Sequence, residues 1–178
     1  ALALLPIVES AYNPQATSHA KAAGLWQFIP STGRIYQLSQ DWWMDERRDV
    51  IESTRAALDY LEKIYALHGN DWFLALASYN WGEGAVGRAI RRNKAAGKPT
   101  DYLNLRMPRE TRNYVPQLIA LRDILESPQD YGLTLPYVEN RPYFAVIDKN
   151  QSIDLKLAAE LAELDQEEFQ ALNPHLRR

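Results

Sequence analysis

A carboxyl side chain near the start of the chain lies among apolar neighbours. Glu9 follows Leu5 by four residues and precedes Tyr12 by three, so on a helix these side chains share one face. An unpaired carboxylate on such a face is costly, and burial raises its pKa. A carboxyl group that stays protonated near neutral pH can act as a general acid. The alternative is a carboxylate at a helix end that bonds to the loop after Pro14, and Glu9 alone does not decide between the two.

Two later segments place hydrogen-bonding side chains between aromatic rings. Residues 24–28 read GLWQF and contain Gln27, and residues 78–84 read SYNWGEG and contain Tyr79 and Asn80. Ser18 lies between Glu9 and the first segment. Sugars bind to aromatic faces and to planar amide groups, and a flanking glycine lets the backbone approach a ligand. Taken singly, each segment is more typical of core packing than of a binding site.

The overall composition is that of a globular protein. Of the 178 residues, 46% are hydrophobic and 24% are charged, which suits one ordinary domain or one domain with a small appendage. The net charge of −3 argues against a nucleic-acid partner, because phosphate binding requires clustered Lys and Arg. One local basic run is interpreted as a solvated helix face, with contact to an anionic polymer as the alternative; it consists of Arg88, Arg91, Arg92 and Lys94.

The scarcity of cysteine and histidine excludes several kinds of site. The chain has no cysteine, so it has no disulfide scaffold, no thiolate metal site and no cysteine nucleophile. Its three histidines are widely spaced, which argues against a histidine metal site and against a Ser-His-Asp triad. We therefore expect neither a metal nor another cofactor.

The elements that must position these side chains are predicted to be helices. Apolar periodicity and capping residues predict four of them within the first 126 residues, over residues 49–68, 72–79, 82–94 and 108–126. Asn70 or Asp71 can cap the second of these helices, and Pro116 predicts a kink in the fourth. No alternating strand pattern occurs here, so we predict an all-α core. The adjacent Trp42 and Trp43 are interpreted as a core contact rather than as a platform in a cleft.

The two ends of the chain differ from this core. Residues 1–5 are apolar without a cap, so we expect residue 1 to lie inside a helix that begins upstream, with any export signal or lipid anchor also upstream. No apolar run approaches the ~20 residues of a membrane span. Residues 127–142 are predicted to be a linker or wrapping segment. Residues 143–147 predict a short strand, and residues 155–164 and 166–172 predict two short helices.

Four motifs in a fixed order carry a resemblance to a known family. They are Glu9-Ser10, then residues 24–27 (GLWQ), residues 79–82 (YNWG) and residues 113–116 (NYVP). Over residues 1–126 this arrangement resembles the soluble lytic transglycosylase-like domain, which is related to goose-type lysozyme. The resemblance implies a mainly α, lysozyme-like catalytic domain whose cleft holds a peptidoglycan strand. In this family the residue before the glutamine is often Met, where this chain has Trp26.

The same resemblance implies roles for individual residues. Glu9 matches the catalytic acid and base of the family. The matches to substrate-binding positions are Ser18, Gln27, Tyr79, Asn80 and Tyr114. Of these, Ser18 matches a serine that orients the substrate N-acetyl group or the reacting hydroxyl, and Tyr114 matches a tyrosine close to the catalytic carboxyl group.

The number of carboxyl groups near the motifs bears on the reaction type. A glycoside hydrolase normally needs two, and here only Glu9 is well placed, since Glu83 is interpreted as a helix start. One carboxyl group suffices if the substrate's own C6 hydroxyl attacks C1 and closes a 1,6-anhydro ring, as the resemblance implies. The alternatives are a hydrolytic muramidase of goose-type lysozyme character and a non-catalytic peptidoglycan-binding protein. The substrate implies a periplasmic location, with membrane contact only through an upstream anchor.

The C-terminal residues carry a separate resemblance. Residues 143–178 resemble the first part of a LysM module, a peptidoglycan-binding βααβ unit. They lack its usual Gly-Asp-Thr-Leu turn, and the chain stops before a second strand. We therefore expect a small α+β appendage that either binds glycan or packs on the catalytic domain.

Overall fold

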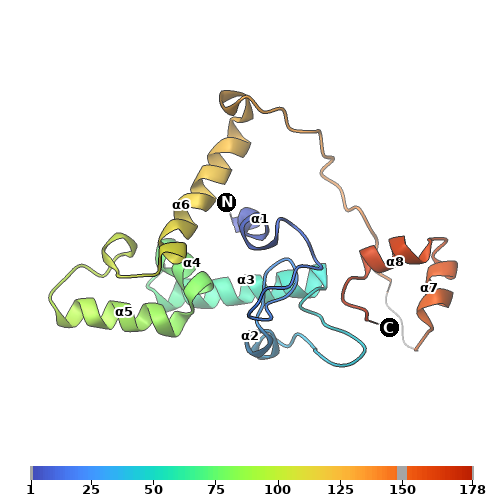
Figure 1. Cartoon of the computed structure of the whole chain (residues 1–178), viewed down its shortest axis with the longest axis horizontal. Helices are drawn as coiled ribbons and strands as arrows, with labels where there is room; N and C mark the ends of the chain where they lie inside the picture. The colour runs from blue at the N-terminus through green and yellow to red at the C-terminus, as the bar shows by residue number, and fades with distance from the viewer. Residues whose placement is uncertain (1, 148–151, 178) are drawn as a thin grey trace.

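The fold is described by a computed structural model that covers residues 2–147 and 152–177 (Figure 1). Helices account for the regular structure of these residues, and the only β pairing among them is a set of isolated bridges. In chain order the elements are η1 (Leu2–Leu4), α1 (Leu5–Ser10), α2 (Pro30–Ile35), α3 (Val50–Leu67), α4 (Trp72–Trp81), α5 (Glu83–Ala95), η2 (Tyr102–Asn104), α6 (Arg109–Glu126), η3 (Pro128–Tyr131), α7 (Leu155–Leu161) and α8 (Gln166–Leu172). The prediction of a mainly α fold is confirmed.

The four long helices lie where capping residues and apolar spacing predict them. Asp49 caps α3 by accepting hydrogen bonds from the backbone N–H of Ile51 and Glu52. Of the two candidates for the cap of α4, Asp71 fills the position. The last helix of the core, α6, continues through Pro116. A side-chain acceptor at the N-terminus satisfies backbone N–H groups that have no partner within the helix, which explains why the starts of α3 and α4 are well defined.

Helix α4 is the centre of the core, because it packs against α3, α5 and α6. Leu74, Ala75, Leu76 and Ala77 are all buried, as an almost wholly apolar helix predicts. The short helix α1 joins this core through Leu5, which is completely buried, and it contacts α6. Leu5 therefore anchors the helix that carries Glu9.

The segment after α6 leaves the core and returns to it (Figure 1). Residues 132–147 form no helix or strand and are exposed. The strand predicted over residues 143–147 is wrong: Tyr143 is 89% exposed and Ile147 is 84% exposed. A strand needs a partner for its backbone groups. The residues after α8, which would supply that partner in a βααβ unit, pair instead with the core, where Leu176 forms a bridge with Met44.

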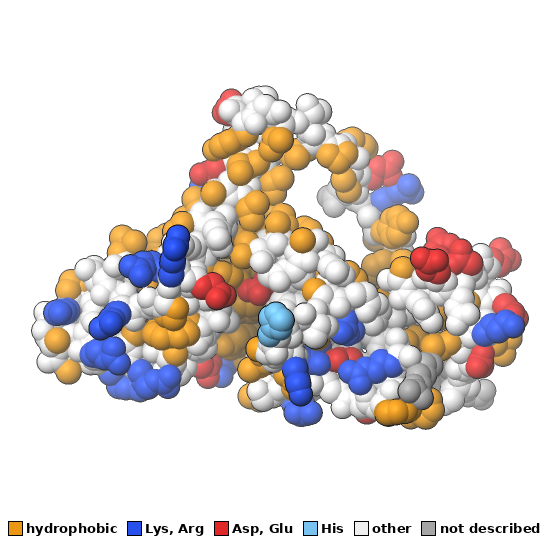
Figure 2. Space-filling model, viewed as in Figure 1, with side chains coloured by type: hydrophobic (Ala, Val, Ile, Leu, Met, Phe, Trp, Pro, Cys, Tyr) orange, Lys and Arg blue, Asp and Glu red, His pale blue; other side chains and the backbone are white. Residues whose placement is uncertain are grey.

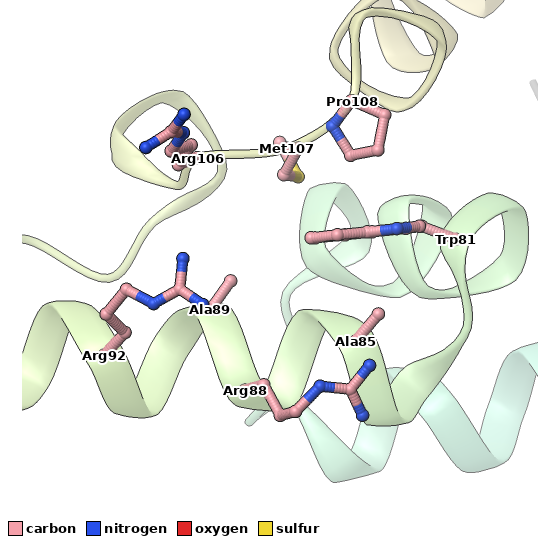
Figure 3. Close-up of a pocket in the computed structure, with 8 residues that line it drawn as sticks. All are labelled: Trp81, Ala85, Arg88, Ala89, Arg92, Arg106, Met107 and Pro108. Atoms are coloured by element: carbon pink, nitrogen blue, oxygen red, sulfur yellow. The ribbon is translucent and has the colours of Figure 1, made fainter.

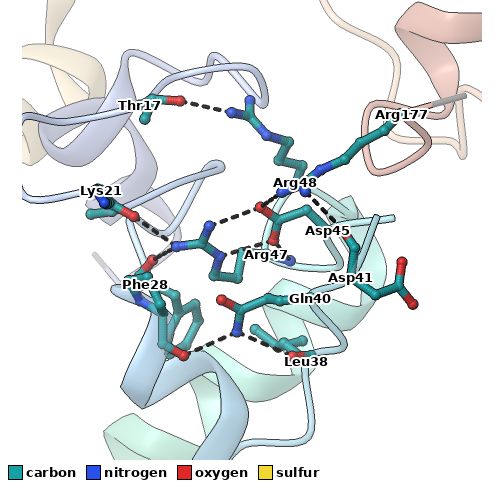
Figure 4. Close-up of polar contacts among 12 residues, drawn as sticks. Thr17, Lys21, Phe28, Leu38, Gln40, Asp41, Asp45, Arg47, Arg48 and Arg177 are labelled. Atoms are coloured by element: carbon teal, nitrogen blue, oxygen red, sulfur yellow. Dashed lines mark hydrogen bonds and ion pairs between the residues drawn. The ribbon is translucent and has the colours of Figure 1, made fainter. Parts of the chain in front are cut away.

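The C-terminal residues are held to the loop before α3 by a buried carboxylate (Figure 4). Asp45 is 1% exposed and accepts hydrogen bonds from Arg47 and from Arg177, each at 2.8 Å. The backbone adds two further bonds: Asp45 N–H donates to the carbonyl of His175, and Arg177 N–H donates to that of Trp43. The C-terminal residues therefore pack on the helical core, which agrees with one of the two expected arrangements.

The pKa of Asp45 reflects two opposed effects, its burial and the positive charges of Arg47 and Arg177. Burial alone would raise the pKa of Asp45, but the hydrogen bonds and charges of Arg47 and then of Arg177 outweigh burial and lower it. A carboxyl group whose pKa is lower in the folded protein stabilises the fold at pH values above its unfolded pKa. That contribution is lost as the pH falls through the folded pKa.

Replacing Arg177 with alanine should destabilise the fold by about 1–2 kcal/mol near neutral pH, because it removes a charged partner of a buried carboxylate. The loss should shrink in acid as Asp45 becomes protonated. Urea unfolding at a series of pH values measures both effects. The matched control is Arg141→Ala, since Arg141 pairs with Glu139 on the exposed return segment and should change stability by less than about 0.5 kcal/mol. Equal stabilities of the two variants would contradict this account of the contact.

Candidate active site

Glu9 lies in the last turn of α1, and its side chain is half-buried. It contacts α6 through the side chain of Tyr114. The phenol of Tyr114, on α6, donates a hydrogen bond to Glu9 Oε1. Burial raises the pKa of Glu9 from 4.5 to about 7; the hydrogen bond from Tyr114 opposes this rise, and the negative charge of Glu110 adds to it. The carboxyl group is therefore partly protonated at neutral pH, as a group that both gives and takes a proton must be.

Two tyrosines near Glu9 keep their protons at neutral pH. Burial, followed by the charge of Glu9, raises the pKa values of both Tyr114 and Tyr79. Tyr79 donates its hydroxyl to the carbonyl of Trp26 at 2.9 Å. A phenol that remains protonated can serve only as a neutral hydrogen-bond partner, so neither tyrosine competes with Glu9 for the proton of a reaction.

The first aromatic segment, residues 24–28, forms the wall that positions α1. Ser10 donates its hydroxyl to the carbonyl of Leu25 at 3.0 Å, and the indole N–H of Trp26 donates to Thr54 Oγ1 at 2.8 Å. Gly24 has a φ of +82°, and a β-carbon there would lie 1.7 Å from the carbonyl oxygen of Arg47. Only glycine fits this approach. These residues hold the site in place, and Trp26 is a buried core residue.

Two of the predicted substrate-binding residues, Ser18 and Gln27, lie on the loop between α1 and α2. Ser18 is exposed, and its Oγ accepts a hydrogen bond from the backbone N–H of Ala22, which closes a tight turn. The amide nitrogen of Gln27 donates to the carbonyl of Gly24 at 2.9 Å. Gln27 itself has a φ of +50°, a conformation that costs a non-glycine residue free energy of about 1 kcal/mol or more. Such a backbone is often found where a side chain is held for function.

Asn80 joins the second aromatic segment to α6. Its amide nitrogen donates to Glu110 at 3.1 Å, and its amide oxygen accepts from Thr111 at 2.7 Å. Both hydrogen-bonding faces of this amide are thus engaged within the protein. Because α6 also carries Tyr114, Asn80 sets the position of α6 and of the phenol that contacts Glu9.

Glu110 is a second carboxyl group at the site, and none of the sequence motifs includes it. Glu110 precedes Tyr114 by four residues on α6, so both side chains lie on the same face of the helix. That spacing was the available signal. Glu83, the rival weighed from the sequence, is the first residue of α5 and pairs with Lys63 at 3.0 Å, as its interpretation as a helix start predicts.

The prediction that Trp42 and Trp43 form a core contact is wrong. Their exposed fractions are 61% and 63%. The reason is local: the carboxylate of Asp41 accepts hydrogen bonds from the backbone N–H of Trp43 and of Met44, which fixes a turn at the surface. In this turn Met44 forms the bridge with Leu176.

Comparison with known proteins agrees with this geometry. Residues 1–101 match the family described as "Transglycosylase SLT domain". Residues 143–178 match the family described as "Lytic transglycosylase MltD, LysM-like domain". Both resemblances drawn from the sequence are thereby confirmed.

Individual relatives extend the likeness. "Membrane-bound lytic murein transglycosylase D" of Escherichia coli (strain K12) is 45% identical over 172 residues, which are 97% of this chain and 38% of that protein. The "Putative tributyltin chloride resistance protein" of Alteromonas sp. (strain M-1) is 35% identical over 82% of this chain and 69% of its own length. A "Putative soluble lytic murein transglycosylase" of Haemophilus influenzae is 32% identical over 63% of this chain and 19% of its own length.

The chain thus spans little more than a third, 38%, of the Escherichia coli relative. Its match to the domain family, by contrast, runs over residues 1–101 and takes in Glu9, Gln27, Tyr79 and Asn80. This chain belongs to the transglycosylase SLT domain family.

Proposed function

We propose that this chain cleaves the β-1,4 bond between N-acetylmuramic acid and N-acetylglucosamine in peptidoglycan without water, leaving 1,6-anhydromuramic acid ends. The observation that carries the proposal is the Glu9 carboxyl group, whose pKa of about 7 suits both donation and acceptance of a proton. Membership of the family and the names of its lytic murein transglycosylase relatives support the same reaction.

The proposed reaction uses one carboxyl group twice. Glu9 first gives its proton to the glycosidic oxygen, and the bond between this oxygen and muramyl C1 breaks with assistance from the muramyl N-acetyl group. The resulting carboxylate then takes the proton of the muramyl C6 hydroxyl, whose oxygen forms a new bond to C1. Glu9 ends protonated, as it began, and no water is consumed.

The neighbouring residues have supporting roles in this proposal. The hydrogen bond from Tyr114 holds the Glu9 carboxyl group in one orientation. Tyr79 and Asn80 maintain the wall and the helix that face it. Gln27 and Ser18 are proposed to bind the sugar and its N-acetyl group from the loop of residues 16–28.

A hydrolytic muramidase is the second candidate, and Glu110 is the observation that favours it. Its charge acts on Glu9, so a water held between the two carboxyl groups would have both an acid and a base. The hydrogen bond from Asn80 to Glu110 argues for a positional role instead. The reaction product decides between the two candidates.

The substrate implies a periplasmic location for the chain, and the upstream anchor stays a prediction. Within the part of the chain that the structure describes, no helix has the length and apolar character of a membrane span.

Substitution of Glu9 by glutamine should lower product formation from purified peptidoglycan by at least about 100-fold, because glutamine cannot transfer a proton. Mass spectrometry of the digests should show muropeptides lighter by one water than reducing ends for the wild-type protein only. The matched control Glu62→Gln changes an exposed glutamate of α3 and should leave the products unchanged. Reducing ends in the wild-type digest would support the hydrolase.

The same Glu9→Gln variant should be more stable than the wild type at pH 8, by about 3 kcal/mol. The sign follows from the raised pKa: below pH 4.5 Glu9 is protonated in both the folded and the unfolded state, whereas above about pH 7 its charge must be buried on folding. Thermal or urea unfolding at pH 4 and pH 8 measures the difference. A variant that is less stable at pH 8 would contradict the burial of a costly charge.

Two further substitutions should move the alkaline limb of the activity profile in opposite directions, because activity requires the protonated form of Glu9. Tyr114→Phe removes a hydrogen bond that lowers the pKa of Glu9, so the limb should move to higher pH. Glu110→Gln removes a charge that raises this pKa, so the limb should move to lower pH. Profiles of kcat/KM against pH test both shifts, with the exposed Tyr131→Phe as control. Shifts in the same direction would refute this electrostatic account.

A further inference from the structure

A pocket of about 380 Å³ lies between the end of α4, helix α5 and the segment that leads into α6 (Figure 3). Its wall has an aromatic and apolar side and a cationic side. The lining side chains that matter here are Trp81, Met107 and Pro108 on the first side, and Arg88, Arg92 and Arg106 on the second. No feature of the proposed reaction at Glu9 uses this pocket.

The cationic side of the pocket carries charge that the protein does not neutralise. The lining contains three arginines and no carboxylate. Among the residues that the structure describes, none of the three forms an ion pair, whereas Arg55 and Arg122 each pair with carboxylates on their own helices. Figure 2 shows the basic side chains gathered over α5. In a chain of net charge −3, unpaired arginines around one hollow make a site for an anion.

The pocket and the site around Glu9 are built from adjoining residues of the same part of the chain. Trp81 directly follows Asn80, which bonds to Glu110 on α6. Pro108 precedes the same helix, and Tyr114 lies six residues further on, about 9 Å along the helix axis. A peptide of about four residues reaches roughly 13 Å when extended. A short chain attached to a sugar beside Glu9 is therefore longer than this separation along α6.

We propose that this pocket binds the carboxylate-bearing peptide stem that N-acetylmuramic acid carries in peptidoglycan, an assignment that rests on the proposed function. The guanidinium groups of Arg92 and Arg106 pair with a stem carboxylate, for which the planar fork of arginine is well suited. Trp81 and Met107 pack against the apolar side chains of the stem. The pocket thereby makes the enzyme prefer glycan strands that still carry peptides.

The test compares intact, uncrosslinked glycan strands with the same strands after an amidase has removed their stems. The measured quantity is the ratio of kcat/KM on intact strands to kcat/KM on stripped strands. For the double variant Arg92→Ala/Arg106→Ala we expect this ratio to fall about tenfold, the loss of one charge-assisted contact. The control is Arg91→Ala, which removes a neighbouring arginine of α5 that does not line the pocket and should keep the wild-type ratio. An unchanged ratio in the double variant overturns the proposal.

A binding measurement separates this proposal from the proposed reaction. Calorimetry with the Glu9→Gln protein and short soluble strands should show tighter binding of intact than of stripped strands, and the double variant in the same background should lose that difference. If the wild-type protein cleaves neither kind of strand, the reaction fails while this binding arm still decides the pocket. If inorganic phosphate displaces intact strands at concentrations comparable to theirs, the pocket is an unselective anion site and the stem assignment is wrong.

Discussion

The structure depends on one unfavourable interaction, the burial of a carboxyl group that forms no ion pair with the described residues. Burial raises the pKa of Glu9 to about 7, and among the described residues its side chain accepts one hydrogen bond, from the neutral phenol of Tyr114. An arginine in place of Tyr114 would lower the pKa of Glu9 and leave a carboxylate unable to protonate anything near neutral pH. The surrounding core must therefore hold α1 in place by apolar contact, as Leu5 does, rather than by charge.

The family motifs are mostly scaffolding for this one group. Gly24 allows the backbone of residues 24–28 to approach that of Arg47, and Trp26 is bonded at both its indole and its carbonyl. Both the nitrogen and the oxygen of the Asn80 amide form hydrogen bonds with side chains of α6. Gly24, Trp26 and Asn80 thus fix the positions of their neighbours.

Local signals predicted the four long helices of the core, because each of them is specified within its own sequence. Asp49 and Asp71 cap helices that follow immediately, and the apolar face around Glu9 is visible from spacing alone. One failure involves a contact distant in sequence. The strand over residues 143–147 lacks its partner because Leu176 pairs with Met44. Trp42 and Trp43 read as core residues from their apolar type, but the carboxylate of Asp41 accepts hydrogen bonds from the backbone N–H of Trp43 and of Met44 and fixes a turn at the surface.

A direct titration of the Glu9 carboxyl group tests most closely whether its pKa is raised in the folded protein. The protein would be labelled with carbon-13 at the glutamate side-chain carboxyl, and the Glu9 resonance assigned by its absence from Glu9→Gln. We expect a midpoint near pH 7, set by burial and by the opposed effects of Tyr114 and Glu110. A midpoint near the ordinary value of 4.5 would show that Glu9 is solvated and ionised at neutral pH, and the proposed acid would be unavailable.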